Sequence, residues 1–343
     1  MISQRANEYP ATSGDITSAD VWTTWRVAME RALYGRDGFY LRERPSRHFR
    51  TSVNASPAFA EAVVRILTDL DVRLGHPPRL DLVDIGAGEG TLVAQILTLV
   101  HEPPHHELAA RLRLTGVDLA PRPPGLPAEI AWCDSCPKAV TGLIICNEWL
   151  DNVPLDVAEG TTEGPRIVLV DPATGKERLG PPPEPADLAW LERWWPLSPG
   201  RRAEIGRTRD EAWASVLGRL TRGRAIAVDY AHPVDNRPPC GTLCGYRDGT
   251  LVPPIPDGSC DITAHVALDS CAATAPAGRT VTRLTTQREA LRALGLTGAR
   301  PPIELAHTAP REYLRALARA GEEAELIDPT GLGGFGWLCH DIG

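Results

Sequence analysis

The sequence predicts an α/β fold built on a mainly parallel sheet with helices on both faces. Short, continuous apolar runs alternate with helical patterns, which is typical of buried parallel strands. The predicted strands cover residues 79–85 (RLDLVDI), 111–119 (RLRLTGVDL), 141–147 (TGLIICN) and 223–231 (GRAIAVDYA). A glycine-rich stretch, LVDIGAGEGTL, joins the first strand to a helix expected over residues 89–100. This strand, turn and helix form the first unit of the predicted core.

The segments before the core are predicted to be largely helical. We expect residues 1–19 to form a flexible tail, and Ser18 begins an amphipathic pattern that predicts a helix to Tyr34. An irregular loop follows. Pro57 then begins a second helix that reaches about Leu74, because proline is favoured in the first turn of a helix. The N-terminal helices are assigned to residues 20–78.

Residues 149–221 are predicted to form an insert or lid in a single domain whose core covers residues 79–148 and 222–343. The insert contains a predicted hairpin over residues 166–179 (RIVLVDPATGKERL) and two helices over residues 187–195 and 208–220. Four tryptophans in it are expected to pack between insert and core: Trp190, Trp194, Trp195 and Trp213.

The C-terminal part is predicted to add a hairpin, two helices and one strand. GTLCGYRDGTLVPP has the pattern of a hairpin with its turn at Asp248 and Gly249. Helices are expected over residues 287–296 and 310–321. The final run, GFGWLCHDI, is expected to close an edge of the sheet.

Composition narrows the class of protein. The 343 residues carry a formal net charge of −8 and only two lysines, with no basic block of the kind that binds nucleic acid. The N-terminus lacks the apolar core of a secretory signal, and no run approaches the roughly 18 apolar residues of a membrane span. We therefore expect a cytoplasmic protein.

The eight cysteines are expected to be reduced and free of metal. Cys133 and Cys136 form one pair, and Cys240 and Cys244 form a second pair with wider spacing. A four-thiolate zinc site would require both pairs to meet in space, and structural sites prefer tighter, repeated spacing.

Gly86, Gly88 and Gly90 fall at alternate positions where the first strand turns into a helix. Glycine lets the backbone approach a ligand closely, and a helix N-terminus lies next to it. A dinucleotide site would need the spacing G-x-G-x-x-G. Here the third glycine comes one residue earlier than in that motif, and Glu89 places negative charge where a pyrophosphate would lie. The pattern with Asp84 before it resembles the first motif of S-adenosylmethionine-dependent methyltransferases, and an NAD-dependent dehydrogenase is the disfavoured alternative.

Acidic residues follow the next two strands. Asp118 ends the second strand and is positioned to accept hydrogen bonds from ribose hydroxyls. The alternative is a surface aspartate. Asn147, Glu148 and Asp151 follow the third strand. In an open α/β sheet the ligand crevice lies beyond these strand ends, so we expect Asn147 to contact the cofactor and the two carboxylates to lie beside its reactive methyl group.

The stretch NEWLDNVPLDV resembles the NE-hydrophobic-hydrophobic-DA-hydrophobic-P motif of the MidA family of S-adenosylmethionine-dependent methyltransferases. Three further stretches resemble this family: FYLRERPSRHFRTSVNASPAFAE, AIAVDYAHP and GTLCGYRDGTLVPPIPDGSCDITAHV. In the first of them the matching residues are Phe49, Thr51, Ser52, Ser56, Pro57 and Phe59. Ala231 and Ala267 depart from the family pattern, which has glycine and aspartate there.

The resemblance implies a class I, Rossmann-like methyltransferase fold with S-adenosyl-L-methionine as the cofactor and a protein arginine as the acceptor. The family includes a mitochondrial complex I assembly factor, so a respiratory complex I subunit is an implied partner. Glu148 and Asp151 are candidate catalytic residues that would orient the guanidinium and take up its proton. His265 is a further candidate base or hydrogen-bond anchor, with Asp261 as its orienting partner. Asp229, Tyr230 and Asp261 are expected to bind the substrate.

The alternatives for these residues are structural. Asp151 would cap the helix that follows it, His265 would be a satisfied core histidine, and Asp229 and Tyr230 would pack at the crevice floor. Two other functions stay open, which are methylation of a small molecule in secondary metabolism and binding of the cofactor by an assembly factor without turnover.

Overall fold

The computed structural model describes residues 22–43, 51–276 and 278–343. The predicted N-terminal tail and Phe49 lie outside these ranges. The main sheet has seven strands in the order β14-β15-β10-β5-β2-β3-β4. Their bounds are β2 (Leu80–Ile85), β3 (Leu112–Val117), β4 (Ile130–Cys133), β5 (Val140–Asn147), β10 (Leu220–Asp229), β14 (Thr280–Thr286) and β15 (Gly336–Ile342).

The sheet confirms the predicted α/β fold. β10, β5, β2, β3 and β4 pair in parallel, and β15 is antiparallel to both β10 and β14. The prediction that the final run closes the sheet edge is wrong, because β15 lies between β10 and β14 and the edge strand is β14. The sequence TVTRLTT of β14 is mostly exposed and lacks an apolar pattern, so it gave no strand signal.

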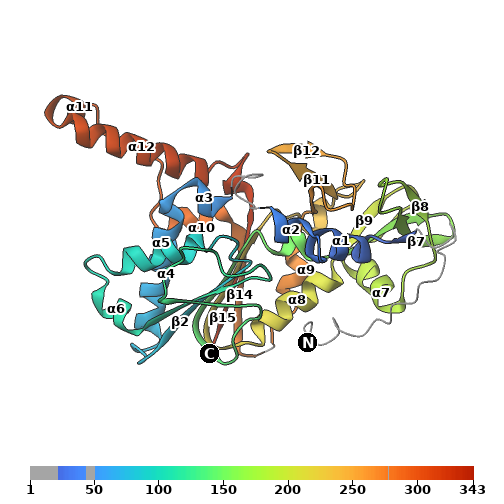
Figure 1. The fold of residues 1–343 in the computed structure, drawn as a ribbon, viewed down its shortest axis with the longest axis horizontal. Helices are drawn as coiled ribbons and strands as arrows, with labels where there is room; N and C mark the ends of the chain where they lie inside the picture. Colours follow the sequence, from blue (N-terminus) through green and yellow to red (C-terminus); the bar gives the residue numbers. More distant parts are fainter. Residues whose placement is uncertain (1–21, 44–50, 277) are drawn as a thin grey trace.

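Helices cover both faces of this sheet (Figure 1). On one face lie α4 (Pro57–Arg73), α5 (Thr91–Val100) and α10 (Gln287–Ala293), with α6 (His106–Arg111) beyond them. Their side chains pack on Leu82 and Ile145 in the largest core cluster. On the other face α8 (Arg207–Leu217) and α9 (Leu268–Ala272) pack on Val83 and Ile144. Because helices cover both faces of the sheet, β2 and β5 have apolar side chains on both of their faces.

The N-terminal segment pairs with the insert. Its elements are β1 (Thr23–Thr24), α1 (Trp25–Tyr34), α2 (Phe39–Arg42) and α3 (Ser52–Ala55). The first helix therefore begins at Trp25, capped by Thr24, rather than at Ser18, because residues 23 and 24 pair with β7. The second predicted helix is confirmed as α4, and the region expected to be an irregular loop contains α2 and α3.

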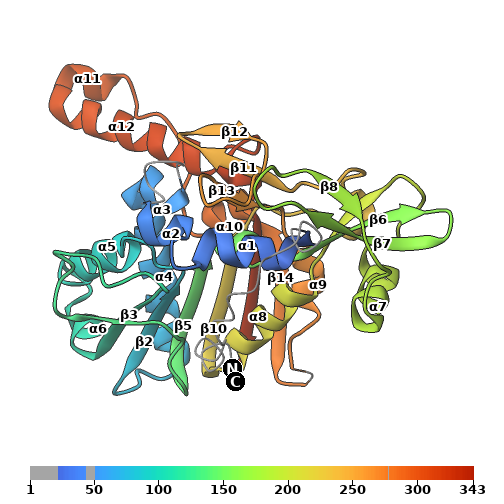
Figure 2. The ribbon, with the colours of Figure 1, turned by 45° about the vertical axis from the view of Figure 1, so that its right-hand side comes forward.

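The insert elements form a second sheet beside the main one (Figure 2). It contains β6 (Asp156–Thr161), β7 (Gly164–Val170), β8 (Glu177–Leu179) and β9 (Arg202–Ile205), with α7 (Pro185–Trp194) packed against it. The predicted hairpin is confirmed by the pairing of β7 with β8. Trp190, Trp195 and Trp213 are buried packing residues, and Trp194 is half-buried. The action of this segment as a lid stays a prediction.

A third sheet, β12-β11-β13, lies above the carboxyl ends of the main strands (Figure 2). It consists of β11 (Cys244–Arg247), β12 (Thr250–Val252) and β13 (Asp261–Thr263), and the three short 3-10 helices of the described chain are η2 (Leu150–Asn152), η3 (Val234–Asn236) and η4 (Leu332–Gly334). The predicted hairpin turn is confirmed, because Asp248 and Gly249 have φ of 51° and 72° between β11 and β12.

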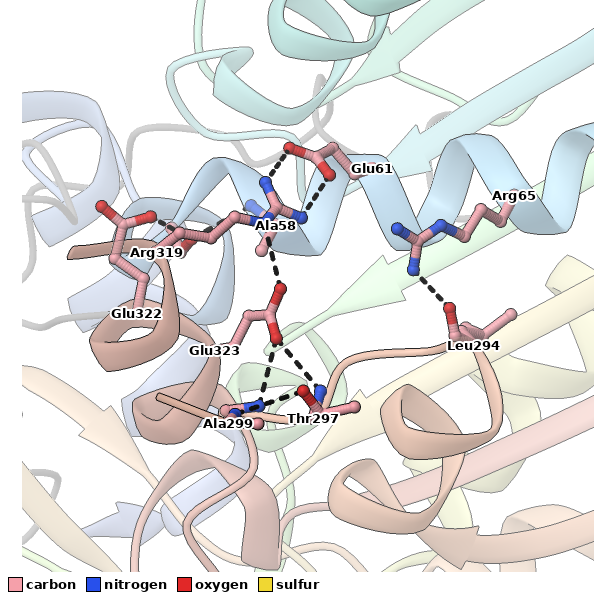
Figure 3. A network of polar contacts seen from close by, with 11 residues as sticks. Ala58, Glu61, Arg65, Leu294, Thr297, Ala299, Arg319, Glu322 and Glu323 are labelled. Atoms are coloured by element: carbon pink, nitrogen blue, oxygen red, sulfur yellow. Dashed lines mark hydrogen bonds and ion pairs between the residues drawn. The ribbon is translucent and has the colours of Figure 1, made fainter. Parts of the chain in front are cut away.

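The C-terminal helices α11 (Glu304–Thr308) and α12 (Pro310–Leu326) form an arm that extends from the body (Figures 1 and 2). The arm is fastened to α4. Both Nη atoms of Arg319 donate to the carboxylate of Glu61 at 2.6 Å, and Glu323 binds Arg319 from the other side (Figure 3). Ser56, the cap of α4, donates to Glu322 at 2.8 Å. No helix in the described parts of the chain is long and apolar enough to span a bilayer.

Candidate active site

The glycine turn between β2 and α5 has the left-handed backbone that its sequence predicts. Gly86, Gly88 and Gly90 have φ of 72°, 54° and 73°. A Cβ atom on Gly86 would lie 2.9 Å from Trp149 Cδ1, whereas a Cβ atom on Gly88 would meet nothing within 4 Å. Gly88 is therefore the point where the turn faces open space and where a ligand can approach the backbone.

Two aspartates flank this turn at the ends of neighbouring strands. Asp118 follows β3, and its Oδ2 accepts the Gly88 N–H at 2.8 Å while its Oδ1 accepts the Ala120 N–H at 2.8 Å. Burial raises the pKa of Asp118, and burial together with the charge of Asp118 raises the pKa of Asp84 to about 8. Each oxygen of Asp118 keeps a further lone pair. Asp118 thus supports the turn and stays a predicted ribose acceptor.

Glu148 begins the segment beyond β5 in an unusual conformation. Its φ is 52°, and its N–H donates to Val228 O of β10 at 2.8 Å. A left-handed residue other than glycine costs on the order of 1–3 kcal/mol and tends to occur where geometry serves function. Its Oε1 accepts from the Ser52 N–H at 3.1 Å and from Asn147 Nδ2 at 3.0 Å. Burial raises the pKa of Glu148 to about 8.

Asp229 and Asp151 meet at the end of β10. Oδ2 of the buried Asp229 accepts the N–H groups of Leu150 and Asp151 at 2.9 and 3.1 Å, so it caps η2. Asp151 Oδ2 accepts the Thr263 hydroxyl at 2.7 Å. Burial raises the pKa of both aspartates. Capping was the structural alternative for Asp151, and the residue that caps this helical turn is Asp229.

Three buried oxygen atoms at these strand ends have no hydrogen-bond partner among the described residues. They are Asn147 Oδ1, Asp151 Oδ1 and Asp229 Oδ1. Unpaired buried polar atoms are rare and call for an explanation such as a ligand or a retained proton. When the two carboxyl groups are ionised all three are acceptors, so a ligand that satisfied them would have to bring N–H or O–H donors.

His265 and Tyr230 lie together, and Asp261 binds elsewhere. The two rings stack with centroids 5.4 Å apart, and Phe335 packs on Tyr230. The Asp261 carboxylate instead accepts from Tyr40 Oη at 2.6 Å and Asn152 Nδ2 at 3.1 Å. Because these donors hold Asp261, the expected orienting bond from Asp261 to His265 is not formed. Burial and the charge of Arg209 lower the pKa of His265, which favours the neutral ring.

Arg209 of α8 is a site residue that the sequence reasoning missed. It is buried, and it donates to the carbonyl groups of Ala264 and His265 at 2.9 Å and to those of Val153 and Asp151. Its charge lies near Asp151 and Asp229. The sequence did contain one indication that Arg209 is buried. It lies one helical turn before Trp213, on the apolar face of the predicted helix.

Tyr34 and Tyr40, from the N-terminal helices, were also missed. Their rings stack 5.6 Å apart, and Tyr34 Oη donates to Asn152 O at 3.1 Å. Burial, followed by the charges of Asp261 and Asp151, raises the pKa of Tyr34. These neutral phenols place aromatic surface next to the carboxylates.

All eight cysteines are free thiols. Across the described ranges, no group of three or more His, Cys, Asp or Glu side chains is arranged to hold a metal ion.

Comparison with known proteins adds three findings. Residues 58–285 match the family described as "Putative S-adenosyl-L-methionine-dependent methyltransferase". The structure is similar to that of a COG1565 superfamily protein from Burkholderia thailandensis bound to S-adenosyl-homocysteine, with a TM-score of 0.77, 25% identity, and coverage of 94% of this chain and 89% of that chain. An uncharacterized COG1565 superfamily protein from the same organism gives a TM-score of 0.75, 26% identity and coverage of 94% and 88%. No curated protein matches the sequence.

Proposed function

This chain belongs to the family of S-adenosyl-L-methionine-dependent methyltransferases that matches residues 58–285, and we propose that it methylates a guanidinium nitrogen of a protein arginine. The methyltransferase class and the cofactor rest on the family match and on the similar structure that contains S-adenosyl-homocysteine. The arginine acceptor is our proposal. A respiratory complex I subunit, which the MidA resemblance implies, is the candidate protein that carries the arginine.

The observation that carries the proposal is the set of unpaired acceptors at the strand ends. Within the described residues, Asn147 Oδ1, Asp151 Oδ1 and Asp229 Oδ1 have no donor, and the carboxyl groups of Glu148 and Asp261 lie near Asp151. A guanidinium group has five N–H donors, no acceptor and a fixed positive charge. It could donate to such acceptors and brings no acceptor of its own that would need a partner. Tyr34 and Tyr40 supply aromatic surface of the kind that packs well against a guanidinium.

The residues predicted to hold the cofactor are compatible with it. Gly88 faces open space, Asp118 has lone pairs for ribose hydroxyls, and Asp84 and Asn147 lie at adjacent strand ends. When bound, S-adenosyl-L-methionine supplies an electrophilic methyl group on a positively charged sulfur. Carboxylates near that charge are favourable, whereas they would repel a pyrophosphate.

We assign two tasks to the acceptor residues. Glu148 and Asp151 would hold the guanidinium so that one nitrogen points along the line of displacement, which is the main requirement of methyl transfer. As the attacking nitrogen bonds to the methyl carbon, the bond between that carbon and the sulfur would break and S-adenosyl-homocysteine would leave. The nitrogen would also lose one proton, which ionised Glu148 would accept. The pKa of Glu148 of about 8 is that of the protein alone, and the positive charge of a bound guanidinium favours the ionised form. Neutral His265 is the alternative acceptor.

Incubation with radiolabelled S-adenosyl-L-methionine and a lysate tests the proposal. We expect a labelled protein band whose acid hydrolysate contains methylarginine, and no label with Glu148→Gln. Label in another amino acid would contradict the arginine acceptor. Label in a small molecule would support the alternative from secondary metabolism, which the departures at Ala231 and Ala267 suggest. Cofactor binding without any label would support an assembly factor.

A further inference from the structure

A chain of hydrogen bonds connects the C-terminal end of α12 to Glu148. Leu326 O accepts from Gln287 Nε2 at 3.0 Å, and Gln287 Oε1 accepts from the Ser52 hydroxyl at 3.0 Å. The Ser52 N–H then donates to Glu148 Oε1 at 3.1 Å. Three segments that are far apart in the sequence therefore meet at one catalytic candidate.

The two middle residues of this chain have little freedom to move. Ser52 and Gln287 are both fully buried. The N–H of Gln287 donates to Phe335 O at 2.8 Å, and its side-chain donor is used by Leu326 O, so its oxygen has to face Ser52. Leu326 lies at the end of α12, the helix that Arg319 fastens to α4 (Figure 3). Ser52 itself opens α3, whose N-cap is Thr51.

Glu148 needs this support because its surroundings are unfavourable to a carboxylate. Asp151 and Asp229 face it with like charge, and Tyr230 lies beside it as a neutral phenol. The Ser52 N–H and Asn147 Nδ2 are the two donors that reach its side chain in the described residues. Asn147 precedes Glu148 directly in the chain, so Ser52 is the donor brought from elsewhere in the fold.

We propose that Ser52 and Gln287 are positioning residues for methyl transfer, which hold the Glu148 carboxylate at the end of β5 through the Ser52 N–H. Within the described residues, both hydrogen bonds to the Glu148 side chain end on Oε1, so we assign Oε2 to the acceptor. This inference rests on the proposed role of Glu148. It adds that two residues without contact to the acceptor, one of them more than one hundred positions from Glu148 along the chain, set the orientation and ionisation of that carboxylate.

A direct titration of Glu148 tests the inference without an acceptor. The full-length protein would be labelled with 13C at the glutamate carboxyl carbon, and its spectrum followed from pH 5 to 10, with Glu148→Gln identifying the signal. Ser52→Ala removes the hydroxyl that anchors the donor, and Gln287→Leu removes its partner. We expect the Glu148 midpoint to move upward by about half a pH unit or more in each variant, because a loosened N–H stabilises the ionised form less well.

Ser270→Ala is the matched control. Ser270 is also buried and its hydroxyl also donates to one side-chain oxygen, that of Asp210, which lies in a different part of the fold. The control should lose a comparable amount of thermal stability and leave the Glu148 midpoint unchanged. A midpoint that stays within about 0.2 units of wild type in Ser52→Ala would overturn the inference, even if Gln287→Leu failed to fold.

The titration also separates this inference from the proposed function. If wild-type protein methylates no arginine, the proposed function fails, yet a shifted midpoint still establishes the role of Ser52 and Gln287. If arginine is methylated, the acid limb of the kcat profile should move upward in Ser52→Ala while the Kd for S-adenosyl-L-methionine stays within a few-fold. An unchanged profile together with an unchanged midpoint would reject the inference and leave the proposed function intact.

Discussion

Glu148 is the residue on which most of the proposed chemistry depends. Its left-handed backbone turns the side chain at the strand end, where two N–H donors hold one oxygen. Its pKa of about 8 means that the protonated form dominates at neutral pH in the protein alone. A group with these properties is suited to accept a proton once a cation lies beside it.

The first prediction is the pH dependence of the reaction. The rate at limiting cofactor and acceptor should rise with pH through a midpoint near or below 8, because Glu148 must lose its proton to act as base. The pKa of His265 is lowered, so the imidazole stays neutral across this range. Rate profiles of wild type and Glu148→Gln would show this, with Glu163→Gln in the exposed hairpin as a control of the same chemistry. A flat profile in wild type would remove Glu148 from the proton transfer.

The second prediction concerns Asp118 and the cofactor. Asp118→Ala should weaken binding of S-adenosyl-L-methionine by about 1–3 kcal/mol, because the ribose loses an acceptor and the Gly88 N–H loses its partner. Asp118→Asn keeps one oxygen and should lose less. Isothermal titration calorimetry on both variants measures this, and an unchanged affinity in Asp118→Ala would leave Asp118 with only its structural role in the glycine turn.

The residues that the sequence could identify share one property. Asp84, Asp118, Asn147 and Glu148 directly follow or end apolar strands, so a strand pattern is enough to bring them together. Arg209, Tyr34 and Gln287 belong to helices that reach the site only through tertiary packing. A local pattern can place such a residue on a buried helix face, as for Arg209, but it does not show that the residue reaches the site. Asp261 is another residue whose contacts could not be predicted from sequence neighbours. Its closeness to His265 along the chain suggested that the two side chains pair, but the Asp261 carboxylate accepts a hydrogen bond from Tyr40 instead.

At the scale of elements, α8 links the insert to the strand ends. Arg209 fills the space between η2 and the segment after β13 with donors for four carbonyl groups. A buried guanidinium of this kind holds backbone segments in place, and these segments carry Asp151 and His265. The helix therefore fixes the acceptor side of the site although it contributes no residue to the predicted chemistry.

The third prediction follows from this link. Arg209→Met should destabilise the protein by roughly 3–5 kcal/mol, because buried carbonyls and two buried aspartates lose their positive partner. Arg207→Met on the same helix is the control, since Arg207 pairs with Asp187 and Glu211 nearer the surface and should cost about 1 kcal/mol or less. Urea unfolding of both variants gives the comparison, and equal losses would contradict the role of Arg209.

The sequence predicts a strand well where both faces of the strand are buried, and poorly where the strand is exposed or very short. β2, β5 and β10 are apolar because helices cover both faces, and their patterns identified them. β14 is exposed and rich in threonine, and β1 has two residues, so neither carried a pattern. β15 lies inside the sheet because β14 pairs with its outer side. Since the sequence did not predict β14, it could not predict this position of β15.

At the scale of the whole molecule, five of the nine buried carboxyl groups in the described residues form no ion pair. Burial raises the pKa of Asp84 and Glu148 to about 8 and that of Asp261 to about 7. Elsewhere, hydrogen bonds from arginines hold two carboxyls below their usual range. Hydrogen bonds from Arg111 lower the pKa of Asp71, and although burial opposes it, three arginines lower that of Asp341. The two groups of carboxyls have opposite effects on the pH dependence of stability. As pH rises, the first group lowers the free energy of unfolding and the second group increases it.

The fourth prediction is a maximum of stability in mild acid. Asp84, Glu148 and Asp261 keep their protons to higher pH in the folded than in the unfolded protein, so the free energy of unfolding falls as pH rises from the ordinary carboxyl range to about 8. The contributions of Asp71 and Asp341 are present above that range and are lost as pH falls below it. Thermal unfolding across pH should show the maximum, and Asp84→Asn should flatten its alkaline side. A stability that increases steadily to pH 8 would contradict this balance.

A crystal structure with S-adenosyl-homocysteine and an arginine peptide tests the central claim most directly. We expect the cofactor against Gly88 and Asp118, its sulfur directed toward the ends of β5 and β10, and the guanidinium hydrogen-bonded to Glu148 and Asp151 with one nitrogen facing the sulfur. A sulfur directed away from these carboxylates, or a guanidinium bound at another surface, would contradict the account.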